Sequence, residues 1–170
     1  MNGFLNPSEV LKKLDLGKSL IAADFGSGAG GWAIPLARSL EEGKVFAIDI
    51  LEEPLSVLNS KIKAQKLFNI EIVRGDVEKG TRLLNETCNL VLMTNLLFEC
   101  ENKKKVLEEG KRVLRKGGKI LVVDWKKESL LGPKEKVSPK EVKKLAQDIG
   151  LKLEKEFEAG PQHYGLLFSK

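Results

Sequence analysis

The sequence predicts an α/β fold, a doubly wound and mostly parallel seven-stranded sheet with an antiparallel C-terminal strand and helices on both faces. Short apolar runs rich in β-branched residues alternate with longer amphipathic stretches, which is typical of strands and helices that wind around a parallel sheet. The length of 170 residues suffices for one domain with its own core but is short for two. We therefore expect a single domain over residues 1–170.

The elements follow from these patterns in order. A first helix over residues 8–15 precedes the sheet. The apolar runs give the expected strands, which cover residues 19–24, 45–49, 70–74, 90–94, 120–124, 151–157 and 164–169. The amphipathic stretches give the remaining helices, which cover residues 31–40, 54–66, 103–114 and 140–149. The last two strands would form a hairpin.

Local signals support three of these boundaries. Pro35 falls in the first turn of its helix, where backbone amides have no acceptor within the helix. Ser138, followed by Pro139 and Glu141, is typical of a helix N-cap. The Lys-Gly-Gly segment 116–118 predicts a tight turn that leads into the fifth strand.

Composition narrows the class of protein. The chain has 29 Lys and Arg residues against 24 Asp and Glu, and its pI is about 9.1, but Lys and Glu are mixed along the chain and indicate a solvated surface. This Lys and Glu enrichment is also typical of heat-adapted proteins.

Neither a membrane span nor a signal peptide is present in the pattern, so we expect a cytoplasmic protein. Cys88 and Cys100 form no metal-binding motif, and we interpret both as packing residues, with no metal site.

Aspartate is used in particular places. Of six Asp residues, four fall at or just after the ends of predicted strands, and these are Asp24, Asp49, Asp76 and Asp124. Open α/β sheets bind ligands across the carboxyl ends of their strands, so these carboxylates could reach one bound molecule. The alternative is that each Asp only caps a turn.

A glycine-rich loop joins the first strand to its helix. It runs from Asp24 to Gly31 and contains Gly26, Gly28 and Gly30, so that the backbone can turn tightly and a ligand can approach closely. Gly26, Gly28 and Gly31 also match the dinucleotide fingerprint, with Asp49 at a suitable distance for a ribose. The loop alone therefore leaves an NAD(P)-binding oxidoreductase open.

The ordered set of loop and acids, from about residue 20 to the C-terminus, resembles class I S-adenosylmethionine-dependent methyltransferases. The resemblance implies a Rossmann-like fold in which residues 1–18 form an N-terminal helix, 19–125 the cofactor-binding core and 126–170 the substrate side. In that family the glycine loop packs against the methionine part of the cofactor, the acid after strand two binds the ribose hydroxyls, and the acid after strand three meets the adenine amino group. The implied cofactor residues are Asp24, Gly26, Ser27, Gly28, Gly30, Asp49, Ile50, Gly75, Asp76, Val77 and Asn95.

Segment 94–99 narrows the resemblance to one subgroup of these methyltransferases. It is similar to the part of type 11 methyltransferases, of the ubiquinone and menaquinone biosynthesis kind, that flanks the transferable methyl group. Asn95 would then contact the amino end of the cofactor, although it could equally be the N-cap of the following helix.

The acceptor side is less clearly marked. His163 is the only histidine, and its ordinary pKa near 6.5 suits a general base, although a lone His in a turn more often has no catalytic role. Phe98, Trp125 and Tyr164 are candidate substrate contacts near the methyl-bearing end. Only the first helix, segment 126–137 and the final hairpin are available to cover a substrate.

The sequence thus predicts methyl transfer from S-adenosylmethionine to a small, largely apolar or aromatic acceptor. Alignment of donor and acceptor can supply much of the acceleration of such a displacement, which fits a chain without a nucleophile or metal cluster. An RNA or protein substrate is the alternative that the basic pI favours, although no aromatic RNA-reading motif is present.

Overall fold

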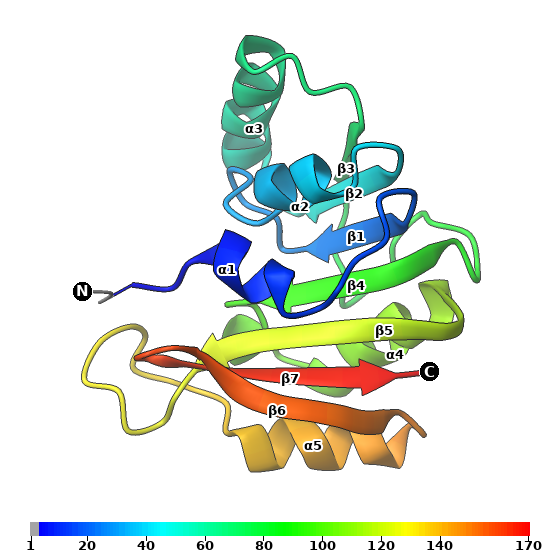
Figure 1. Cartoon of the computed structure of the whole chain (residues 1–170). Coiled ribbons are helices and arrows are strands. Elements are labelled where there is room, and N and C mark those ends of the chain that lie inside the picture. Colours follow the sequence, from blue (N-terminus) through cyan, green and yellow to red (C-terminus); the bar gives the residue numbers. More distant parts are fainter. Residues whose placement is uncertain (1–3) are drawn as a thin grey trace.

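The computed structural model describes residues 4–170, and it confirms the predicted seven-stranded sheet, which has the order β3-β2-β1-β4-β5-β7-β6 (Figure 1). β7 runs antiparallel to both of its neighbours, β5 and β6, and the other pairings are parallel. The strands are β1 (Ile21–Phe25), β2 (Lys44–Asp49), β3 (Ile70–Arg74), β4 (Cys88–Thr94), β5 (Leu114–Trp125), β6 (Lys152–Gly160) and β7 (His163–Ser169).

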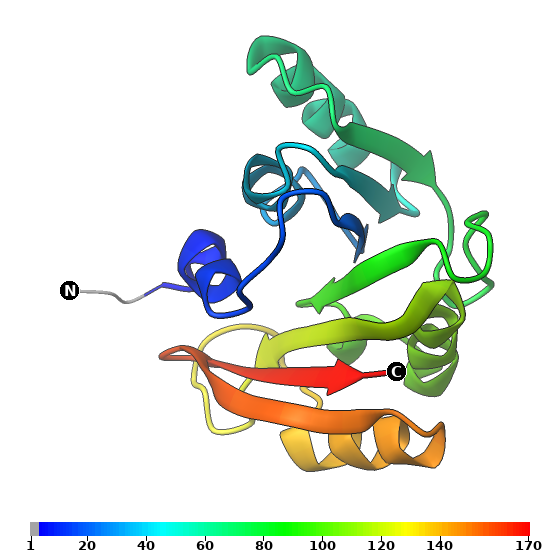
Figure 2. The same cartoon turned by 45° about the vertical axis from the view of Figure 1, so that its right-hand side comes forward.

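Helices cover both faces of the sheet, as predicted (Figures 1 and 2). They are α1 (Pro7–Lys12), α2 (Ala33–Ser39), α3 (Glu52–Ala64), α4 (Lys103–Val113) and α5 (Pro139–Asp148), with a 3₁₀ turn η1 (Leu97–Glu99) after β4. Within residues 4–170, none of the helices is long and apolar enough to cross a membrane.

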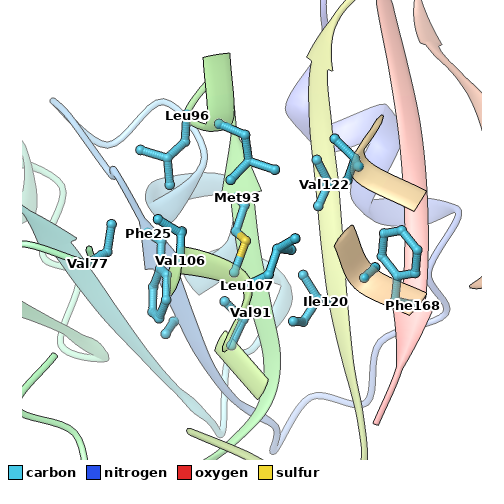
Figure 3. Packing of buried hydrophobic residues seen from close by; sticks show 14 of the residues in the cluster. Phe25, Val77, Val91, Met93, Leu96, Val106, Leu107, Ile120, Val122 and Phe168 are labelled. Carbon is cyan, nitrogen blue, oxygen red and sulfur yellow. The ribbon is translucent and has the colours of Figure 1, made fainter. Parts of the chain in front are cut away.

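Neighbouring side chains of a strand point to opposite faces of the sheet, so the core consists of two layers, one on each face. In β1, Ala22 packs with the layer under α1, α2 and α3, whereas Ala23 and Phe25 pack with the layer under α4 and α5. Figure 3 shows the second layer, in which Phe25 and Met93 from the sheet approach Val106 and Leu107 from α4. Because both faces are buried, the central strands consist of nearly continuous apolar residues.

Helix starts follow the predicted chemistry. The Ser138 hydroxyl accepts a hydrogen bond of 3.1 Å from the Glu141 N–H, and Pro139 is the first residue of α5. Pro35 is the third residue of α2, where its missing N–H costs no helical hydrogen bond.

The prediction for segment 116–118 is wrong, because these residues lie inside β5 and do not form a turn before it. β5 begins at Leu114, which pairs with Cys88, and the register shifts between Cys88 and Leu90. Gly117 has a φ of +75°, so the irregularity that the sequence signals is a bulge-like distortion within a continuing strand. The expected helix over residues 8–15 also ends early, since α1 stops at Lys12.

The connection between β3 and β4 contains no helix, and a side-chain network holds it against α4. Glu109, which is buried, accepts 2.6 Å hydrogen bonds from both the N–H and the hydroxyl of Thr81. Arg112 bonds to Glu109 and donates to the Leu83 carbonyl at 2.8 Å. This network fixes the path of the chain at Thr81 and Leu83, between Asp76 and β4.

The carboxyl ends of the parallel strands meet at one edge of the sheet, on the left in Figure 1. β7 starts at this edge because it runs the opposite way, so His163 lies beside Trp125, the last residue of β5. We call this side the carboxyl edge.

Candidate functional site

The glycine loop leaves β1 at the carboxyl edge and is tied to β2. The N–H groups of Gly26 and Ser27 both donate to the Ile48 carbonyl, at 2.8 and 2.9 Å. Gly26, Gly28 and Gly30 have φ values of +71°, +51° and +87°, a region that side-chain-bearing residues rarely adopt.

The three glycines differ in what surrounds them. A Cβ on Gly26 would lie 2.8 Å from a methyl group of Leu96, and one on Gly30 would collide with Leu58. Apart from Gly28 and its chain neighbours Ser27 and Ala29, no heavy atom of residues 4–170 lies within 4 Å of the corresponding position at Gly28. Gly28 therefore faces open space, whereas Gly30 is a packing position.

The open space at Gly28 belongs to a cleft of about 440 Å³ at the carboxyl ends of β1, β2, β3 and β4. It brings together seven of the predicted cofactor residues, namely Gly26, Gly28, Asp49, Ile50, Gly75, Asp76 and Val77. Six lining residues were not predicted: Leu51, Pro54, Glu78, Leu96, Glu99 and Cys100. All six lie within six residues after a predicted strand end, and Leu96 and Glu99 also belong to segment 94–99, which the resemblance placed beside the transferable methyl group.

Asp49, the last residue of β2, lines the cleft. Its Oδ2 accepts a 2.8 Å hydrogen bond from the Gly28 N–H, and its Oδ1 accepts one of 2.9 Å from the Leu51 N–H. Each carboxylate oxygen can accept more than one hydrogen bond, so Asp49 keeps capacity for two ligand hydroxyls.

Asp76 lines the cleft two residues after the end of β3. Partial burial raises its pKa, but the ion pair with Lys79 at 3.1 Å and the 3.0 Å hydrogen bond from the Glu78 N–H outweigh this, and the net pKa is lowered. Asp76 is therefore ionised at neutral pH and can accept from a ligand amine.

Asp24 does not line the cleft but lies fully buried beneath the glycine loop. Burial, and then the nearby Asp49 carboxylate, raise the pKa of Asp24 from 3.8 to about 8, against a smaller lowering by the Ala33 N–H at the start of α2. Neither carboxylate oxygen has a hydrogen-bond partner of normal geometry among the described residues.

Ser27 and Asn95, like Asp24, have buried side-chain oxygens. The Ser27 hydroxyl and Oδ1 of Asn95 are buried without a partner in the described part of the chain. Asn95 has a φ of +49°, and its N–H donates to the Val123 carbonyl at 2.8 Å, while the N-cap position of η1 is Leu96. Asn95 is thus not the N-cap, and it does not line the cleft.

Glu99 adds a further carboxylate to the cleft. Burial, and then the proximity of Asp49, raise the pKa of Glu99. Cys100, beside it, is a buried free cysteine whose Sγ donates to the Leu96 carbonyl at 3.3 Å. Cys88 is likewise buried, which agrees with the packing role expected for both cysteines.

The candidate acceptor residues lie farther along the carboxyl edge and point to opposite faces of the sheet. The rings of Trp125 and His163 are tilted by 43° with centroids 4.1 Å apart, on the side of α1 and α2. Tyr164 and Asp124 form the next register pair and point toward α4 and α5, where the Tyr164 hydroxyl donates to the Val137 carbonyl at 3.1 Å. The structure therefore places Tyr164 in the core, and Phe98 is half-buried against the same core layer.

His163 is only 5% exposed, and both of its ring nitrogens lack a hydrogen-bond partner within residues 4–170. Burial, followed by the nearby charge of Lys126, lowers its pKa from 6.5. His163 is consequently neutral at pH 7 and can accept a proton.

Asp124 is the fourth acid at the strand ends, and it too lies outside the cleft. Burial raises its pKa from 3.8 to about 6, although the N–H groups of Trp125, Phe98 and Leu97 act in the opposite direction. Its Oδ1 accepts a 2.8 Å hydrogen bond from the Trp125 N–H.

A second cavity of about 420 Å³ opens between α1 and the tip of the β6–β7 hairpin. Its walls include Phe4, Val10, Ala159 and Pro161, with Lys13 among the polar groups. Gly160, also in the wall, is the register partner of His163. This cavity therefore lies next to the Trp125–His163 pair, in the region where the sequence predicted the acceptor to enter.

Comparisons with known proteins agree with this geometry. A model of the methyltransferase domain family matches residues 22–118. The crystal structure of a SAM-dependent methyltransferase from Aquifex aeolicus superposes with a TM-score of 0.89 at 30% identity, covering 96% of this chain and 89% of that one.

Curated relatives include the demethylmenaquinone methyltransferases of Bacillus mycoides and Bacillus cereus. They are 27% and 28% identical over 125 residues, which is 73% of this chain and 52% of each relative. The chain thus spans about half the length of the curated relatives it matches.

Proposed function

The chain belongs to the methyltransferase domain family, and from this premise we propose that it transfers the methyl group of S-adenosylmethionine to a small, largely apolar or aromatic acceptor. The family and the solved relative establish the S-adenosylmethionine-dependent methyltransferase class. The oxidoreductase alternative, which the glycine loop alone left open, is therefore not retained.

The observation that carries the proposal is the spacing of acids along the cleft. Asp49, with lone pairs free beside Gly28, would accept both ribose hydroxyls, and ionised Asp76 would accept from the adenine amino group. Ile50 and Val77 would contact the two faces of the adenine. Gly28 leaves room for the methionine part, because any larger residue would extend into the open cleft.

The buried side-chain oxygens of Asp24, Ser27 and Asn95 would hold the charged end of the cofactor. The unpartnered oxygens of Asp24, Ser27 and Asn95 lie below and beside the loop, and a ligand ammonium group is a donor that could satisfy them. A nearby cation would favour the ionised form of Asp24 and lower its raised pKa.

Catalysis would rest on orientation. When bound, the cofactor supplies a methyl group that is already activated on a sulfonium, so the chain needs to align the acceptor and exclude water. His163, neutral at pH 7 and in tilted ring contact with Trp125, would receive the proton from an acceptor that loses one.

The acceptor would occupy the cavity between α1 and the β6–β7 tip. Its volume lies within the range of small-molecule pockets, and its walls combine apolar side chains with a few polar groups. The name of the curated relatives supports a quinone-type ring as the first acceptor to assay.

Two experiments test the proposal in sequence. Calorimetry with S-adenosylmethionine, S-adenosylhomocysteine and NAD should show saturable binding of the first two alone. A cell extract incubated with isotope-labelled donor should then give a mass-shifted small apolar product. Label that appears only in RNA or protein would reject the small-molecule acceptor but leave the methyltransferase class intact.

A further inference from the structure

The charged side chains that line the cofactor cleft are all acidic. Four carboxylates contribute to its wall, those of Asp49, Asp76, Glu78 and Glu99, and in the described part of the chain no Lys, Arg or His lines it. Lys79, outside the wall, pairs with Asp76 at 3.1 Å. Carboxylates that lie close together disfavour one another's ionised form, so the cleft favours a ligand that brings positive charge.

Glu99 differs from the other three acids because its carboxylate has no partner in the protein. The Asp49 carboxylate accepts from two backbone N–H groups, and Oε1 of Glu78 accepts from the Asn102 N–H at 2.5 Å. Asp76 has its ion pair. The Glu99 side chain is exposed and makes neither a hydrogen bond nor an ion pair within residues 4–170. Its charge is therefore available to a ligand.

The order of the strands places Glu99 on the side of the cleft where the cofactor sulfur would lie. In the proposed orientation the adenine lies after β3, at Asp76, and the ribose after β2, at Asp49. The sulfur joins the ribose to the methionine part at the glycine loop, so it lies on the β1 and β4 side of the ribose. Glu99 ends the turn η1 that follows β4, and Leu96, just before this turn, lies so close to Gly26 that a Cβ there would be 2.8 Å away.

The electrostatics of the turn agree with this placement. Burial, and then the charge of Asp49, raise the pKa of Glu99. Burial also raises the pKa of Asp124, at the end of β5, and Glu99 adds a smaller rise. The Lys103 ammonium donates to the Cys100 carbonyl at 2.9 Å and opposes the rise in the pKa of Cys100, whereas the charge that acts on Glu99 is negative. No basic group of the protein thus neutralises Glu99.

The methyl donor and its product differ in charge at the sulfur. S-adenosylmethionine carries a positive sulfonium. When the methyl group leaves, the electron pair of the C–S bond stays on the sulfur, and S-adenosylhomocysteine has a neutral thioether. A nearby ionised carboxylate attracts the sulfonium by its charge, and this attraction is lost in the product.

We propose that Glu99 is a specificity-determining residue that shifts the affinity of the cleft toward S-adenosylmethionine and away from S-adenosylhomocysteine. The inference rests on the proposed orientation of the cofactor, with its ribose at Asp49. Charge attraction to the donor alone would favour the exchange of spent product for fresh donor after each transfer.

Calorimetry at about pH 7.5, where a Glu near its ordinary pKa of 4.5 is ionised, tests the proposal. Glu99→Gln should weaken S-adenosylmethionine binding about three- to tenfold, a modest factor because Glu99 is exposed, and should leave S-adenosylhomocysteine binding unchanged. Sinefungin, which has an ammonium group in place of the methylated sulfur, should lose affinity as the donor does.

Glu101→Gln is the matched control. It makes the same chemical change two residues along the chain, at an exposed position that does not line the cleft, and should keep the wild-type affinity for all three ligands. Thermal unfolding should show both variants to be as stable as the wild type, because neither side chain has a partner within residues 4–170.

The outcomes separate this inference from the proposed function. An equal loss of S-adenosylmethionine and S-adenosylhomocysteine affinity in Glu99→Gln would mean that Glu99 shapes the cleft without sensing the sulfonium, and would overturn the proposal. Unchanged affinity for all three ligands would overturn it as well, although the methyltransferase function would stand. Failure of the wild type to bind either natural ligand would instead reject the cofactor site, and this inference with it.

Discussion

The backbone N–H of Gly28 donates a 2.8 Å hydrogen bond to Oδ2 of Asp49, and this bond links the loop after β1 to the end of β2. Two parts of the proposed cofactor site that lie 21 residues apart in the chain are thereby held in one geometry. The carboxylate that would bind the ribose also positions the loop that would bind the methionine part. A change at either residue should therefore affect cofactor binding more than it affects the fold.

Asp49→Ala should weaken S-adenosylhomocysteine binding by about 2 to 3 kcal/mol, or roughly 30- to 150-fold, because it removes a charged acceptor of several hydrogen bonds. Calorimetry measures the affinity, and thermal unfolding should show a folded variant. Glu52→Ala removes the same charge from the following turn, where Glu52 pairs with Arg74 in solvent, and should leave affinity unchanged. Wild-type affinity for the Asp49 variant would mean that the ribose site has been assigned to the wrong residue.

Gly28→Val should abolish measurable cofactor binding at a modest cost in stability. Gly117→Val is the matched control, because Gly117 also has a positive φ, of +75°, and an equally open Cβ position, but lies at the far end of β5. Both variants should lose about 1 to 2 kcal/mol of unfolding free energy from backbone strain. Only Gly28→Val should lose cofactor binding. Equal cofactor binding by the two variants would contradict the assignment of the open space beside Gly28 to the cofactor.

The ligand-free protein should lose stability as pH rises from about 4 to about 8. Asp24 has a folded pKa near 8 against an ordinary 3.8, so across this interval the folded state binds more protons than the unfolded state. Asp124, with a pKa near 6, contributes only to the lower part of the interval. Asp24→Asn should flatten the profile between pH 6 and 8, as measured by urea unfolding at each pH. A wild-type profile that does not fall there would show that Asp24 is not held in its neutral form.

Features set by local chemistry could be predicted from the sequence. The glycine loop, the acids at Asp49 and Asp76 and the N-cap at Ser138 each depend on the conformational or hydrogen-bonding properties of a few adjacent residues. The mostly parallel seven-stranded sheet with its antiparallel C-terminal strand was also predicted from the alternation of strands and helices, although exact strand ends were not. β5 continues through Gly117 and Gly118 because pairing with β4 and the C-terminus outweighs the turn preference of the glycines.

Features set by packing could not be predicted. Asp24 lies beneath the loop and not in the cleft, and no local signal encodes its depth. Glu99 and Cys100 line the cleft although they lie five and six residues beyond the predicted strand end, after Asn95 with its φ of +49°. His163 and Tyr164 were both predicted on the acceptor side, as a base and as a substrate contact, but neighbouring residues in a strand point to opposite faces, so only His163 faces the α1 side.

The role proposed for His163 is tested by its effect on turnover. If His163 accepts a proton from the acceptor, His163→Ala should lower kcat by roughly 100-fold or more while S-adenosylmethionine affinity is retained, because His163 does not line the cofactor cleft. Its pKa is lowered from 6.5, so the neutral base is already present at pH 7, and wild-type kcat should fall only when pH drops below the lowered value.

Two further comparisons decide between a base and a positioning residue. His163→Gln keeps a polar side chain but has no basic nitrogen near neutral pH, so a base role predicts that Gln fails as Ala does and that both variants lose the acidic limb of the profile. A positioning role predicts a raised KM with kcat largely restored by Gln. The measurement is kcat and KM for the identified acceptor between pH 5 and 9, with saturating donor. If turnover and the pH profile of His163→Ala match the wild type, alignment of the acceptor in the cavity beside Trp125 would account for catalysis without a base.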